Sequence, residues 1–485
     1  MTFEIVFVLL SLLGMMAALI ADKMRPGMVL FSVVVLFLCV GILTPKEMLE
    51  GFSNKGMITV ALLFLVSEGI RQSGTLGQVI KKLLPQGKTT VFKAQLRILP
   101  SVTFISAFLN NTPVVVIFAP IIKHWAKSVK LPATKFLIPL SYVTILGGIC
   151  TLIGTSTNLV VHGMILEAGY EGFTMFELGK VGIFIAIAGI IYLFIFSKRL
   201  LPDARPDTAV PDEEVEEGEK LHRVEAVLGA RFPGINKKLS DFNFQRHYGA
   251  EVKEIKTRNG QRYVDHLEDV VLREGDTLVV MADDTFIPTW GESSVFVLLT
   301  NGNDPDTSGK KKRWLALILL VLMIVGATVG ELPATKEMFP DIKLDMFFFV
   351  CITTIIMAWT NIFPARKYTK YISWDILITI ACAFAISKAM VNSGVADCVA
   401  GFIIGLSDDY GPHVLLAILF VITNLFTELI TNNAAAALAF PLALSISAQL
   451  GVSPTPFFVV ICMAASASFS TPIGYQTNLI VQGIG

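Results

Sequence analysis

The chain has 485 residues, of which 53% are hydrophobic and 16% are charged, and its formal net charge is zero. Soluble globular proteins carry about a quarter charged residues. The charges here gather in a few segments and leave apolar runs of about 18 to 22 residues, long enough to span the hydrocarbon core of a bilayer. These features argue against a soluble enzyme and indicate a polytopic membrane protein.

The first part of the chain, 1–199, predicts a series of membrane helices. The apolar run at 3–21 lacks a basic leader and a small-residue cleavage site, which indicates a first transmembrane helix that is retained. A helix pair is expected at 93–124, turning at Asn110-Asn111-Thr112, and the segment 134–168 is expected to break between Gly154 and Asn158. The other spans are expected at 26–43, 56–72 and 176–197, with a short amphipathic helix at 75–84.

The middle of the chain differs in composition from the rest. Residues 200–220 contain an acidic run, Asp212-Glu213-Glu214-Val215-Glu216-Glu217, and several prolines, which is typical of a solvated linker. Residues 221–289 predict a small soluble α+β domain, because stretches such as 276–281 favour strands and Arg258-Asn259-Gly260-Gln261 favours a hairpin turn. A second linker is expected at 290–313.

The last part of the chain, 314–485, repeats the pattern of the first part. Spans are expected at 314–330, 345–363 and 374–391, followed by an amphipathic helix at 395–406, a helix pair at 412–449 and a broken span that starts near Pro456. The pair turns at Thr431-Asn432-Asn433, and the last span breaks near Gly474.

Cysteine and histidine spacing gives no sign of a metal site. The six cysteines lie mostly in apolar segments without a CxxC pair, and the six histidines include no HxxxH pair. Free thiols are therefore expected. Neither GxSxG nor HExxH occurs, so the chain is not expected to be an enzyme.

Lysine and arginine in short loops predict the orientation, because they favour the cytoplasmic side. Basic residues gather at 22–25, 71–97, 123–135, 198–199, 310–313 and 366–370, whereas 167–177 and 397–409 are acidic or neutral. This pattern predicts a multi-pass protein of the plasma (inner) membrane with residues 198–313 in the cytoplasm. The first helix pair would enter from the cytoplasm and the second from outside, each as a re-entrant hairpin.

An internal repeat relates the two membrane parts. An offset of 320 residues places Thr157-Asn158-Leu159 on Thr477-Asn478-Leu479 and Gly163 on Gly483. Similar helix composition is the simpler explanation, but order, spacing and polarity recur together. Equivalent segments would cross the membrane in opposite directions, and inverted repeats of this kind are common in secondary transporters. The same offset places a partner for 176–197 near 496–517, so the chain is expected to lack the final helix of this pattern.

The four breaks in the apolar segments predict one polar site. Irregular backbone is costly in hydrocarbon unless it lines a polar cavity or packs within protein. Each break exposes a helix N-terminus, and such N-termini attract anions. No lysine or arginine occurs in these loops, so co-bound Na⁺ would neutralise the anion and couple the two fluxes. The simpler alternative is that asparagine and threonine only cap helices.

At these residues the chain resembles the divalent anion:Na⁺ symporter family, which comprises sodium/sulfate and sodium/dicarboxylate symporters. In that family each of two Ser-Asn-Thr hairpin motifs is followed by a Thr-Pro-Pro-Asn-like break. Asn110-Asn111-Thr112 and Thr431-Asn432-Asn433 stand in place of the hairpin motifs. The resemblance implies an all-α polytopic fold of the ion-transporter superfamily, with inverted-topology repeats, two re-entrant helical hairpins and, here, an inserted α+β cytosolic domain. It also implies Na⁺-coupled anion uptake by an elevator-like alternating-access mechanism.

The resemblance further implies two Na⁺ sites and one substrate site. The first Na⁺ site would comprise Ser106, Asn110, Asn111 and Gly154, and the second Thr427, Ile430, Asn432 and Gly474. Substrate contacts would come from Asn110, Asn111, Thr112, Thr155, Thr431, Asn432, Asn433, Tyr475 and Gln476. Accessory candidates are Asn158, Asn478 and Glu428, the last of which either orders its loop or helps to hold a cation. The sequence departs from the family at Asn110, at Asn433 and at Ser156-Thr157 and Gln476-Thr477, which replace a serine, a threonine and the proline pairs.

The soluble segment resembles the C-terminal regulatory domain of potassium-channel and Trk-type subunits, through Arg231-Phe232-Pro233-Gly234, Gly249-Ala250-Glu251-Val252 and 272–278. Such a domain implies a small regulatory ligand and a homodimer. Symporter relatives with such insertions resemble sulfate transporters, which favours sulfate over dicarboxylates. The alternatives are a dicarboxylate symporter, an oxyanion efflux carrier and a channel gated by the soluble domain. The expected partners are the anion and the lipid bilayer but not nucleic acid, and co-transported Na⁺ is expected without an organic cofactor.

Overall fold

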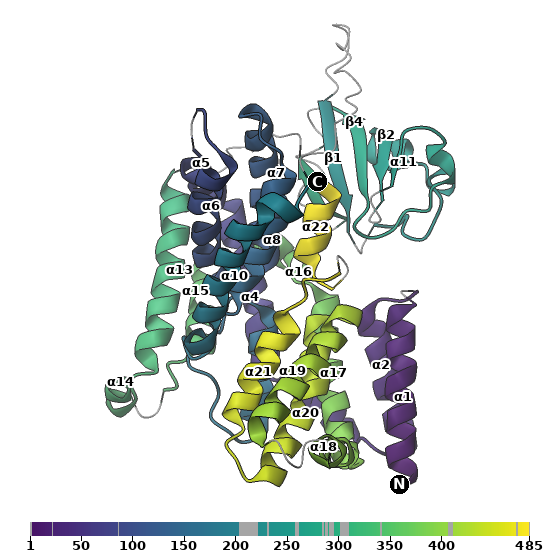
Figure 1. The fold of residues 1–485 in the computed structure, drawn as a ribbon, viewed down its shortest axis with the longest axis vertical. Coiled ribbons are helices and arrows are strands. Elements are labelled where there is room, and N and C mark those ends of the chain that lie inside the picture. Colours follow the sequence, from purple (N-terminus) through teal and green to yellow (C-terminus); the bar gives the residue numbers. More distant parts are fainter. Residues whose placement is uncertain are drawn as a thin grey trace, which may run out of the picture.

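The computed structural model describes residues 2–21, 23–85, 87–202, 222–229, 232–257, 261–283, 286, 290, 295–300, 310–339, 342–405, 411–471 and 474–484. They form a large helical part and a small five-stranded sheet, which lies beside the ends of α7 (Asn111–Ser128) and α22 (Gln476–Ile484) (Figure 1). Seven helical segments among the described residues are long and apolar enough to cross a membrane. The architecture therefore fits a polytopic membrane protein.

The first membrane part contains nine further helices among the described residues, and local signals set their boundaries. They are α1 (Phe3–Ile20), α2 (Pro26–Val40), α3 (Pro45–Glu50), α4 (Lys55–Gln72), α5 (Thr75–Leu83), α6 (Val91–Ser106), α8 (Thr134–Gly148), α9 (Ser156–Glu167) and α10 (Gly179–Leu200). Pro26 is the first residue of α2, and Gly41 ends that helix with φ 83°. Thr44 and Glu47 form a capping box on α3.

The second membrane part follows the same plan up to α22. Its helices are α13 (Lys310–Gly330), α14 (Pro333–Met338), α15 (Met346–Trp359), α16 (Tyr368–Tyr371), α17 (Trp374–Asn392), α18 (Val395–Gly405), α19 (Pro412–Leu429), α20 (Asn432–Leu450) and α21 (Thr455–Ser466). The helix pairs expected at 93–124 and 412–449 are thus α6–α7 and α19–α20. The two later breaks lie where expected as well, because α9 and α22 each begin two residues after Gly154 or Gly474.

The two membrane parts interlock at their breaks. α9 packs on α20, and α22 packs on α7, so the short helix after each later break lies on the helix pair of the other part. Within each part, α8 packs on α6 and α7 as α21 packs on α19 and α20. This recurrence supports the repeat found in the sequence, and it brings the four breaks into one region.

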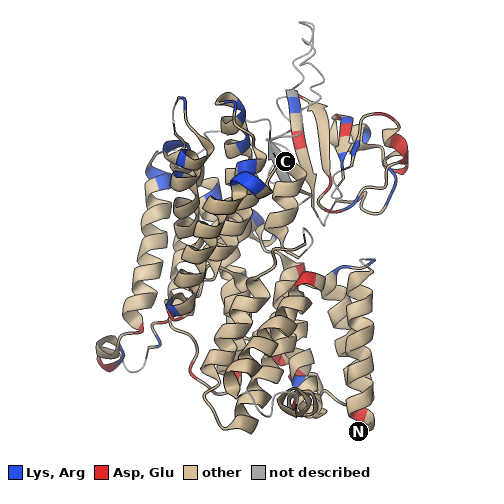
Figure 2. Ribbon diagram, in the orientation of Figure 1, with Lys and Arg blue, Asp and Glu red and all other residues tan. Residues whose placement is uncertain are grey.

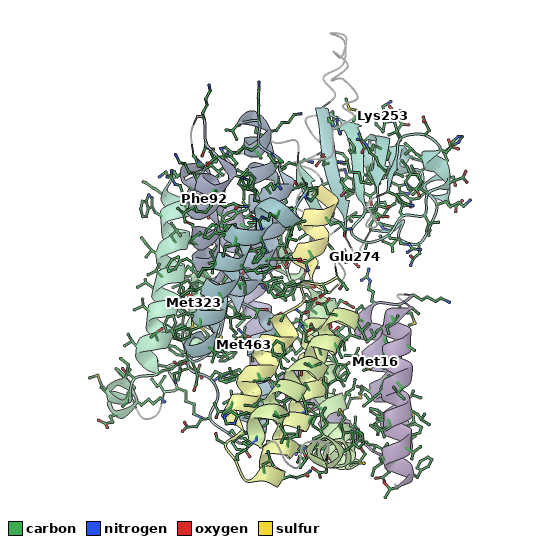
Figure 3. The ribbon with its side chains drawn as sticks, viewed as in Figure 1. Met16, Phe92, Lys253, Glu274, Met323 and Met463 are labelled. Atoms are coloured by element: carbon green, nitrogen blue, oxygen red, sulfur yellow. The ribbon has the colours of Figure 1, made fainter. Side chains whose placement is uncertain are left out.

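Apolar side chains fill the space between the helices (Figure 3). Met323 on α13 and Met463 on α21 are buried inside the helical part, whereas Leu10 on α1 and Phe184 on α10 are 64% and 72% exposed. Outward apolar side chains of this kind suit helices that face lipid. Lysine and arginine gather at the end of the helical part beside the sheet (Figure 2).

The sheet has the antiparallel order β3-β2-β4-β1-β5. Its strands are β1 (His222–Leu228), β2 (Glu251–Lys256), β3 (Arg262–Tyr263), β4 (Thr277–Ala282) and β5 (Phe296–Thr300), and the short helix α11 (Phe244–Tyr248) contacts β2. An aromatic cluster forms its core, in which the ring centroids of Phe232 and Phe242 are 5.0 Å apart.

The domain boundary expected at 289 needs a correction. Residues 290–313 were expected to be a linker, but β5 pairs with β1 and therefore belongs to the sheet. The apolar run 296–300 can form this edge strand because it buries Phe296 in the aromatic cluster. β2 and β3 form the expected hairpin, whereas its turn at 258–260 and the acidic linker at 203–220 lie outside the described residues.

Candidate functional site

Side chains from the two membrane parts meet around Tyr475. Its phenol oxygen lies 2.6 Å from Asn111 Nδ2 and 3.1 Å from Thr155 Oγ1. Beside this contact, Thr112 Oγ1 donates to Gln476 Oε1 at 3.1 Å. Residues from the first two breaks and from the last break therefore form one polar cluster.

The remaining break joins the cluster through Asn433. Its Oδ1 accepts hydrogen bonds from the hydroxyls of Ser156 and Thr157 at 3.3 and 3.2 Å. α7, α9, α20 and α22 begin at or next to the residues of this cluster. Four helix N-termini, each with the positive end of its dipole, consequently lie in one region, which favours an anion there.

Ser106, at the end of α6, connects the first break to α8. Its Oγ lies 2.8 Å from Asn111 Oδ1 and 2.8 Å from Thr144 O, and all three residues are buried. Glycines permit this close approach, because a Cβ on Gly148 would stand 2.6 Å from Asn111 Oδ1 and one on Gly154 would stand 2.5 Å from Gly148 O. The result is a compact set of oxygen atoms, the ligands that hard cations prefer.

The side-chain amide of Asn111 can be satisfied in two orientations. With Oδ1 toward Ser106, its Nδ2 donates to the phenol of Tyr475 at 2.6 Å. With the amide turned over, Nδ2 donates to Ser106 Oγ at 2.8 Å, Thr144 O at 3.1 Å and Gly154 O at 3.3 Å, while Oδ1 accepts from the Tyr475 hydroxyl at 2.6 Å. The turned orientation pairs every donor with an acceptor, so it is favoured when protein atoms alone surround the amide. The first orientation becomes favourable when a cation lies among those oxygens.

Thr427 makes the equivalent contacts in the second part. Its Oγ1 lies 2.8 Å from Asn432 Oδ1 and 2.6 Å from Ala465 O on α21. Thr427, Asn432 and Ala465 stand 321 residues after Ser106, Asn111 and Thr144. The two oxygen clusters are therefore equivalent.

Two further predicted ligands of this second cluster lie at its edges. Ile430 has extended backbone (φ −132°, ψ −179°) between α19 and α20. The N–H of Gly474 donates to Thr471 Oγ1 at 3.1 Å, and a Cβ on Gly474 would collide with Ser468 Oγ at 1.9 Å. Glycine is thus required in this loop for steric reasons, as it is at Gly154.

Asn158 and Asn478 hold the loops that follow α8 and α21. Asn158 Nδ2 donates to Gly148 O at 3.2 Å and Thr151 O at 2.9 Å. Asn478 Nδ2 donates to Ser468 O at 2.9 Å and Thr471 O at 3.2 Å, which are the positions 320 residues later. Both asparagines are buried and therefore position the loops that carry Gly154 and Gly474.

The carboxylate of Glu428 is used by the loop after α21. Oε1 accepts from the N–H groups of Phe469 and Ser470 at 3.0 Å each. Oε2 accepts from the N–H of Thr471 at 3.0 Å and from its hydroxyl at 2.8 Å. Of the two roles expected for Glu428, these contacts favour loop ordering. Ala107 occupies the equivalent position in the first part, so that loop has no such carboxylate.

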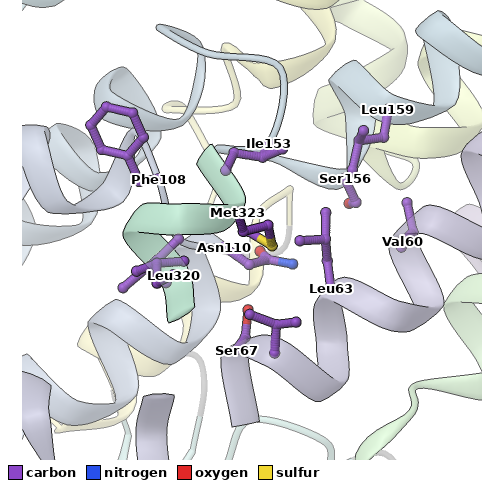
Figure 4. A pocket seen from close by; sticks show the side chains of 12 residues that line it. Val60, Leu63, Ser67, Phe108, Asn110, Ile153, Ser156, Leu159, Leu320 and Met323 are labelled. Carbon is purple, nitrogen blue, oxygen red and sulfur yellow. The ribbon is translucent and has the colours of Figure 1, made fainter. Parts of the chain in front are cut away.

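Asn110, expected in the first Na⁺ site and at the substrate, and Thr431, expected at the substrate, make other contacts. The side chain of Asn110 lines a small pocket between α4, α13 and the first two breaks, together with Ser67 and Ser156 (Figure 4). Most of the other lining side chains are apolar, among them Val60, Leu63, Leu159, Leu320 and Met323. Thr431 caps α20, since its Oγ1 accepts from Ala434 N at 3.4 Å. The hydrogen bonds of Ser106 among the described residues reach Asn111, not Asn110.

Two residues on α8 contact the second part although the sequence analysis did not single them out. Ser141 Oγ lies 2.9 Å from Thr477 Oγ1 and 2.7 Å from Asn478 Oδ1. The hydroxyl of Tyr142 donates to Phe469 O at 2.8 Å. Their sign in the sequence is a polar pair inside an apolar span. The repeat could not reveal them, because the residues 320 positions later are isoleucine and cysteine, and those 321 positions later are cysteine and methionine.

Comparison with known proteins adds the family. The sequence profile described as citrate transporter matches residues 16–449 and, in a second match, residues 338–485. The chain belongs to the citrate transporter family. An uncharacterized transporter of Synechocystis sp. is 28% identical over 538 residues, which cover 93% of this chain and 88% of that protein.

Two relatives whose names state what they transport match shorter stretches of this chain. Sodium/sulfate cotransporter 1 of Chlamydomonas reinhardtii is 32% identical over 265 residues, covering 54% of this chain and 29% of that protein. A sodium-dependent dicarboxylate transporter of Staphylococcus saprophyticus is 28% identical over 119 residues, covering 24% and 23%. These relatives agree with the symporter resemblance of the paired motifs. The protein is accordingly a membrane transporter and not an enzyme.

Proposed function

We propose that this member of the citrate transporter family is a Na⁺-coupled uptake carrier for a divalent anion, with sulfate as the first candidate. The observation that carries the proposal is the meeting of the breaks through Tyr475, Asn111 and Thr155. Four helix N-termini and two equivalent oxygen clusters lie where the breaks meet, and the loops at the breaks contain no lysine or arginine. An anion bound there gains from the helix dipoles and from the charge of co-transported Na⁺.

The two oxygen clusters are the proposed Na⁺ sites. Ser106 Oγ, Asn111 Oδ1 and the carbonyl of Gly154 would hold the first Na⁺. The second would lie at Thr427 Oγ1 and Asn432 Oδ1, with Ile430 and Gly474 contributing carbonyl groups. The anion would lie between the clusters, with hydroxyl and amide donors from Thr112, Thr155, Asn433, Tyr475 and Gln476.

The Asn111 amide supplies a physical reason for coupling. Na⁺ among the oxygens of Ser106 and Gly154 favours the orientation in which Oδ1 faces the cation. Nδ2 then points at the phenol oxygen of Tyr475, which frees the phenol proton to donate to the anion. Without Na⁺ the turned amide engages that proton itself. Cation binding would therefore prepare the donors for the anion.

Transport would proceed by an elevator-like movement of the helix pairs with α8, α9, α21 and α22. The boundary with α4 and α13 supports this division, because Asn110 there lines a pocket whose other walls are largely apolar (Figure 4). Along this pocket few hydrogen bonds would have to break when one body moves past the other, whereas those from Asn54 at the start of α4 to Gly163 and Glu167 on α9 would have to break as well.

The same proposal assigns the cytoplasmic side and the assembly. Lysine and arginine gather at the end beside the sheet (Figure 2), which supports a cytoplasmic location for residues 198–313 in the plasma (inner) membrane. We further propose that the sheet domain binds a small regulatory ligand and that the protein forms a homodimer. Cross-linking of the reconstituted protein would test the dimer.

Uptake into liposomes tests the substrate and the coupling. The purified full-length protein would be reconstituted, and labelled sulfate, succinate and citrate would be offered with and without an inward Na⁺ gradient. We expect Na⁺-dependent sulfate uptake. Uptake of succinate or citrate instead of sulfate would support the dicarboxylate alternative that the staphylococcal relative suggests. Uptake of no anion, or uptake indifferent to Na⁺, would refute the proposed function.

Removal of the two amides tests the Na⁺ sites. Asn111→Ala and Asn432→Ala should each raise the Na⁺ concentration for half-maximal uptake by about tenfold to a hundredfold, since each removes a ligand oxygen. Thr328→Ala is a suitable control, because that hydroxyl bonds to Ile324 O within its own helix, α13. Unchanged Na⁺ dependence in both asparagine variants would show that the breaks only cap helices.

A further inference from the structure

The two residues that follow the break glycines touch each other across the two membrane parts. Thr155 follows Gly154, and Tyr475 follows Gly474, one repeat offset of 320 residues later. Their side-chain oxygens lie 3.1 Å apart, and Asn111 also contacts the phenol. We call the point where these three side chains meet the centre of the site.

The centre is filled unequally by these two residues. The first part contributes a threonine, which is short, and the second contributes a tyrosine, whose phenol oxygen reaches the centre. That oxygen lies 2.6 Å from Asn111 Nδ2 and also interacts with the side chain of Asn432. The tyrosine side chain thus reaches both amides, whereas the shorter side chain of a second threonine would leave this space open.

We propose that Tyr475 is a specificity-determining residue that restricts the site to a compact oxyanion and rejects longer dicarboxylates. This inference rests on the proposed anion carrier and deepens it. The aromatic ring removes length from the space between the two halves, and the phenol adds a donor at its centre. A tetrahedral oxyanion is compact enough to accept hydrogen bonds from the neighbouring hydroxyls of Tyr475 and Thr155 at the same time. A four-carbon dicarboxylate needs two separated groups of donors, which the ring obstructs.

The neighbouring contacts support this assignment. Asn111 and Thr155 are each 1% exposed, so they cannot readily move aside to accommodate a longer ligand. Gly148 is packed against the amide of Asn111 and Gly154 against the backbone of Gly148, since a Cβ on either would stand within 2.6 Å of a neighbouring atom. Tyr475 is half-buried and is the largest side chain of the central group. Its replacement is consequently the change that can enlarge the centre.

Two variants separate the ring from the hydroxyl. Tyr475→Thr reproduces the residue of the first part and opens the centre, whereas Tyr475→Phe keeps the ring and removes the phenol oxygen. Labelled sulfate uptake into liposomes under a Na⁺ gradient would be competed with unlabelled succinate. We expect succinate to compete at least about tenfold better in Tyr475→Thr than in the wild type, as a relieved steric conflict of this size allows. Tyr475→Phe should keep the rejection of succinate while its KM for sulfate rises by about threefold to tenfold, through loss of one hydrogen bond.

Binding in detergent provides a second readout that does not require transport. The thermal unfolding of each variant would be followed in Na⁺ with sulfate or with succinate, because a bound anion stabilises the folded protein. Succinate should raise the Tm of Tyr475→Thr but not that of the wild type or Tyr475→Phe.

The outcomes distinguish the inference from the proposed function. If Tyr475→Thr remains as selective for sulfate as the wild type, both in competition and in Tm shifts, the specificity role of Tyr475 is wrong while the proposed function stands. The specificity role is also wrong if Tyr475→Phe and Tyr475→Thr gain succinate binding equally, or if the wild type takes up succinate. A wild type that neither takes up nor is stabilised by any of these anions in Na⁺ would overturn the proposed function itself.

Discussion

Glu428 offers a sharp test of the proposed second Na⁺ site. Its carboxylate accepts four hydrogen bonds from the loop at 469–471, three from backbone N–H groups and one from a hydroxyl. The same loop reaches Gly474, whose N–H donates to Thr471 Oγ1. Glu428 therefore connects the end of α19 to the backbone that carries a proposed Na⁺ ligand.

The substitution Glu428→Gln keeps the shape of the side chain and changes its chemistry. One oxygen remains an acceptor, while the other becomes an amide nitrogen that faces N–H donors. Two of the four hydrogen bonds to the charged group would be lost, which at about 1.5 kcal/mol each destabilises the ordered loop by about 3 kcal/mol. The apparent Na⁺ affinity falls with the fraction of molecules in which the loop is ordered. The apparent Na⁺ affinity should therefore fall by at most about a hundredfold, and by at least about tenfold once the loop has relaxed.

The assay is Na⁺ activation of labelled anion uptake in liposomes, with the Na⁺ concentration for half-maximal uptake as the readout. Glu177→Gln is the matched control, because Glu177 Oε2 accepts from Thr174 N at 3.2 Å in the loop between α9 and α10. We expect a large rise for Glu428→Gln and none for the control. A lower maximal uptake with unchanged Na⁺ dependence would refute the reasoning, since the loop would then matter for folding or movement and not for Na⁺ binding.

Two further predictions concern packing and pH. Gly148→Ala should remove most Na⁺-driven uptake, because its Cβ would stand 2.6 Å from Asn111 Oδ1, whereas Gly14→Ala has open space and should leave uptake unchanged; overpacking of this kind costs about 1–3 kcal/mol. Normal uptake by Gly148→Ala would contradict the close approach at Asn111. Burial raises the pKa of Glu225 on β1, but its lysine neighbours, Lys123 foremost, outweigh burial and hold that pKa below its usual range. The contact between the sheet and α7 should therefore be fully present above the ordinary glutamate pKa of 4.5 and weaken as the pH falls through the lower folded-state pKa. Thermal unfolding measured against pH should show this loss, and Glu225→Gln should abolish it at a cost of about 1 kcal/mol at neutral pH; identical profiles for both proteins would disprove it.

The positions of the breaks could be predicted from the sequence because their signals are local. Asn110-Asn111-Thr112 and Thr431-Asn432-Asn433 are polar runs inside apolar segments, and α7 and α20 begin within them. Each later break carries a glycine followed by polar residues, Thr155-Ser156 in the first part and Tyr475-Gln476 in the second. Local composition also revealed the sheet, although β5 was assigned to a linker because a polar segment follows it directly.

Contacts between the two parts could not be predicted, because the rotation of one helix against another depends on packing over the whole molecule. Tyr475 was expected near the anion, but its contact with Thr155 follows only from the packing of α22 on α7. The repeat predicts only the features that both copies share. Glu428 and Ser141 have no polar counterpart in the other copy, and their roles became evident from their hydrogen bonds.

One such difference involves the soluble domain. The carbonyl of Gly163, near the end of α9, accepts from Asn54 Nδ2 at the start of α4 at 3.3 Å. The equivalent carbonyl of Gly483, near the end of α22, accepts instead from Thr277 Oγ1 on β4 at 2.9 Å. The sheet therefore holds α22 where the start of α4 holds α9.

The sheet is connected to the site through two helices, α22 and α7. Lys123 on α7 donates to Ile484 O at 2.6 Å and pairs with Glu225 on β1 at 3.2 Å, so the far ends of α7 and α22 are fastened to each other and to the sheet. Both helices begin at the site, α7 with Asn111 and α22 directly after Tyr475. α22 is short, about 13 Å at 1.5 Å per residue, and a helix of that length transmits displacement of one end to the other with little bending. We therefore expect a shift of the sheet at Thr277 to reach the phenol of Tyr475 through α22. Among the described residues, the corresponding carbonyl of the first part is held by Asn54 at the start of α4 instead of by the sheet.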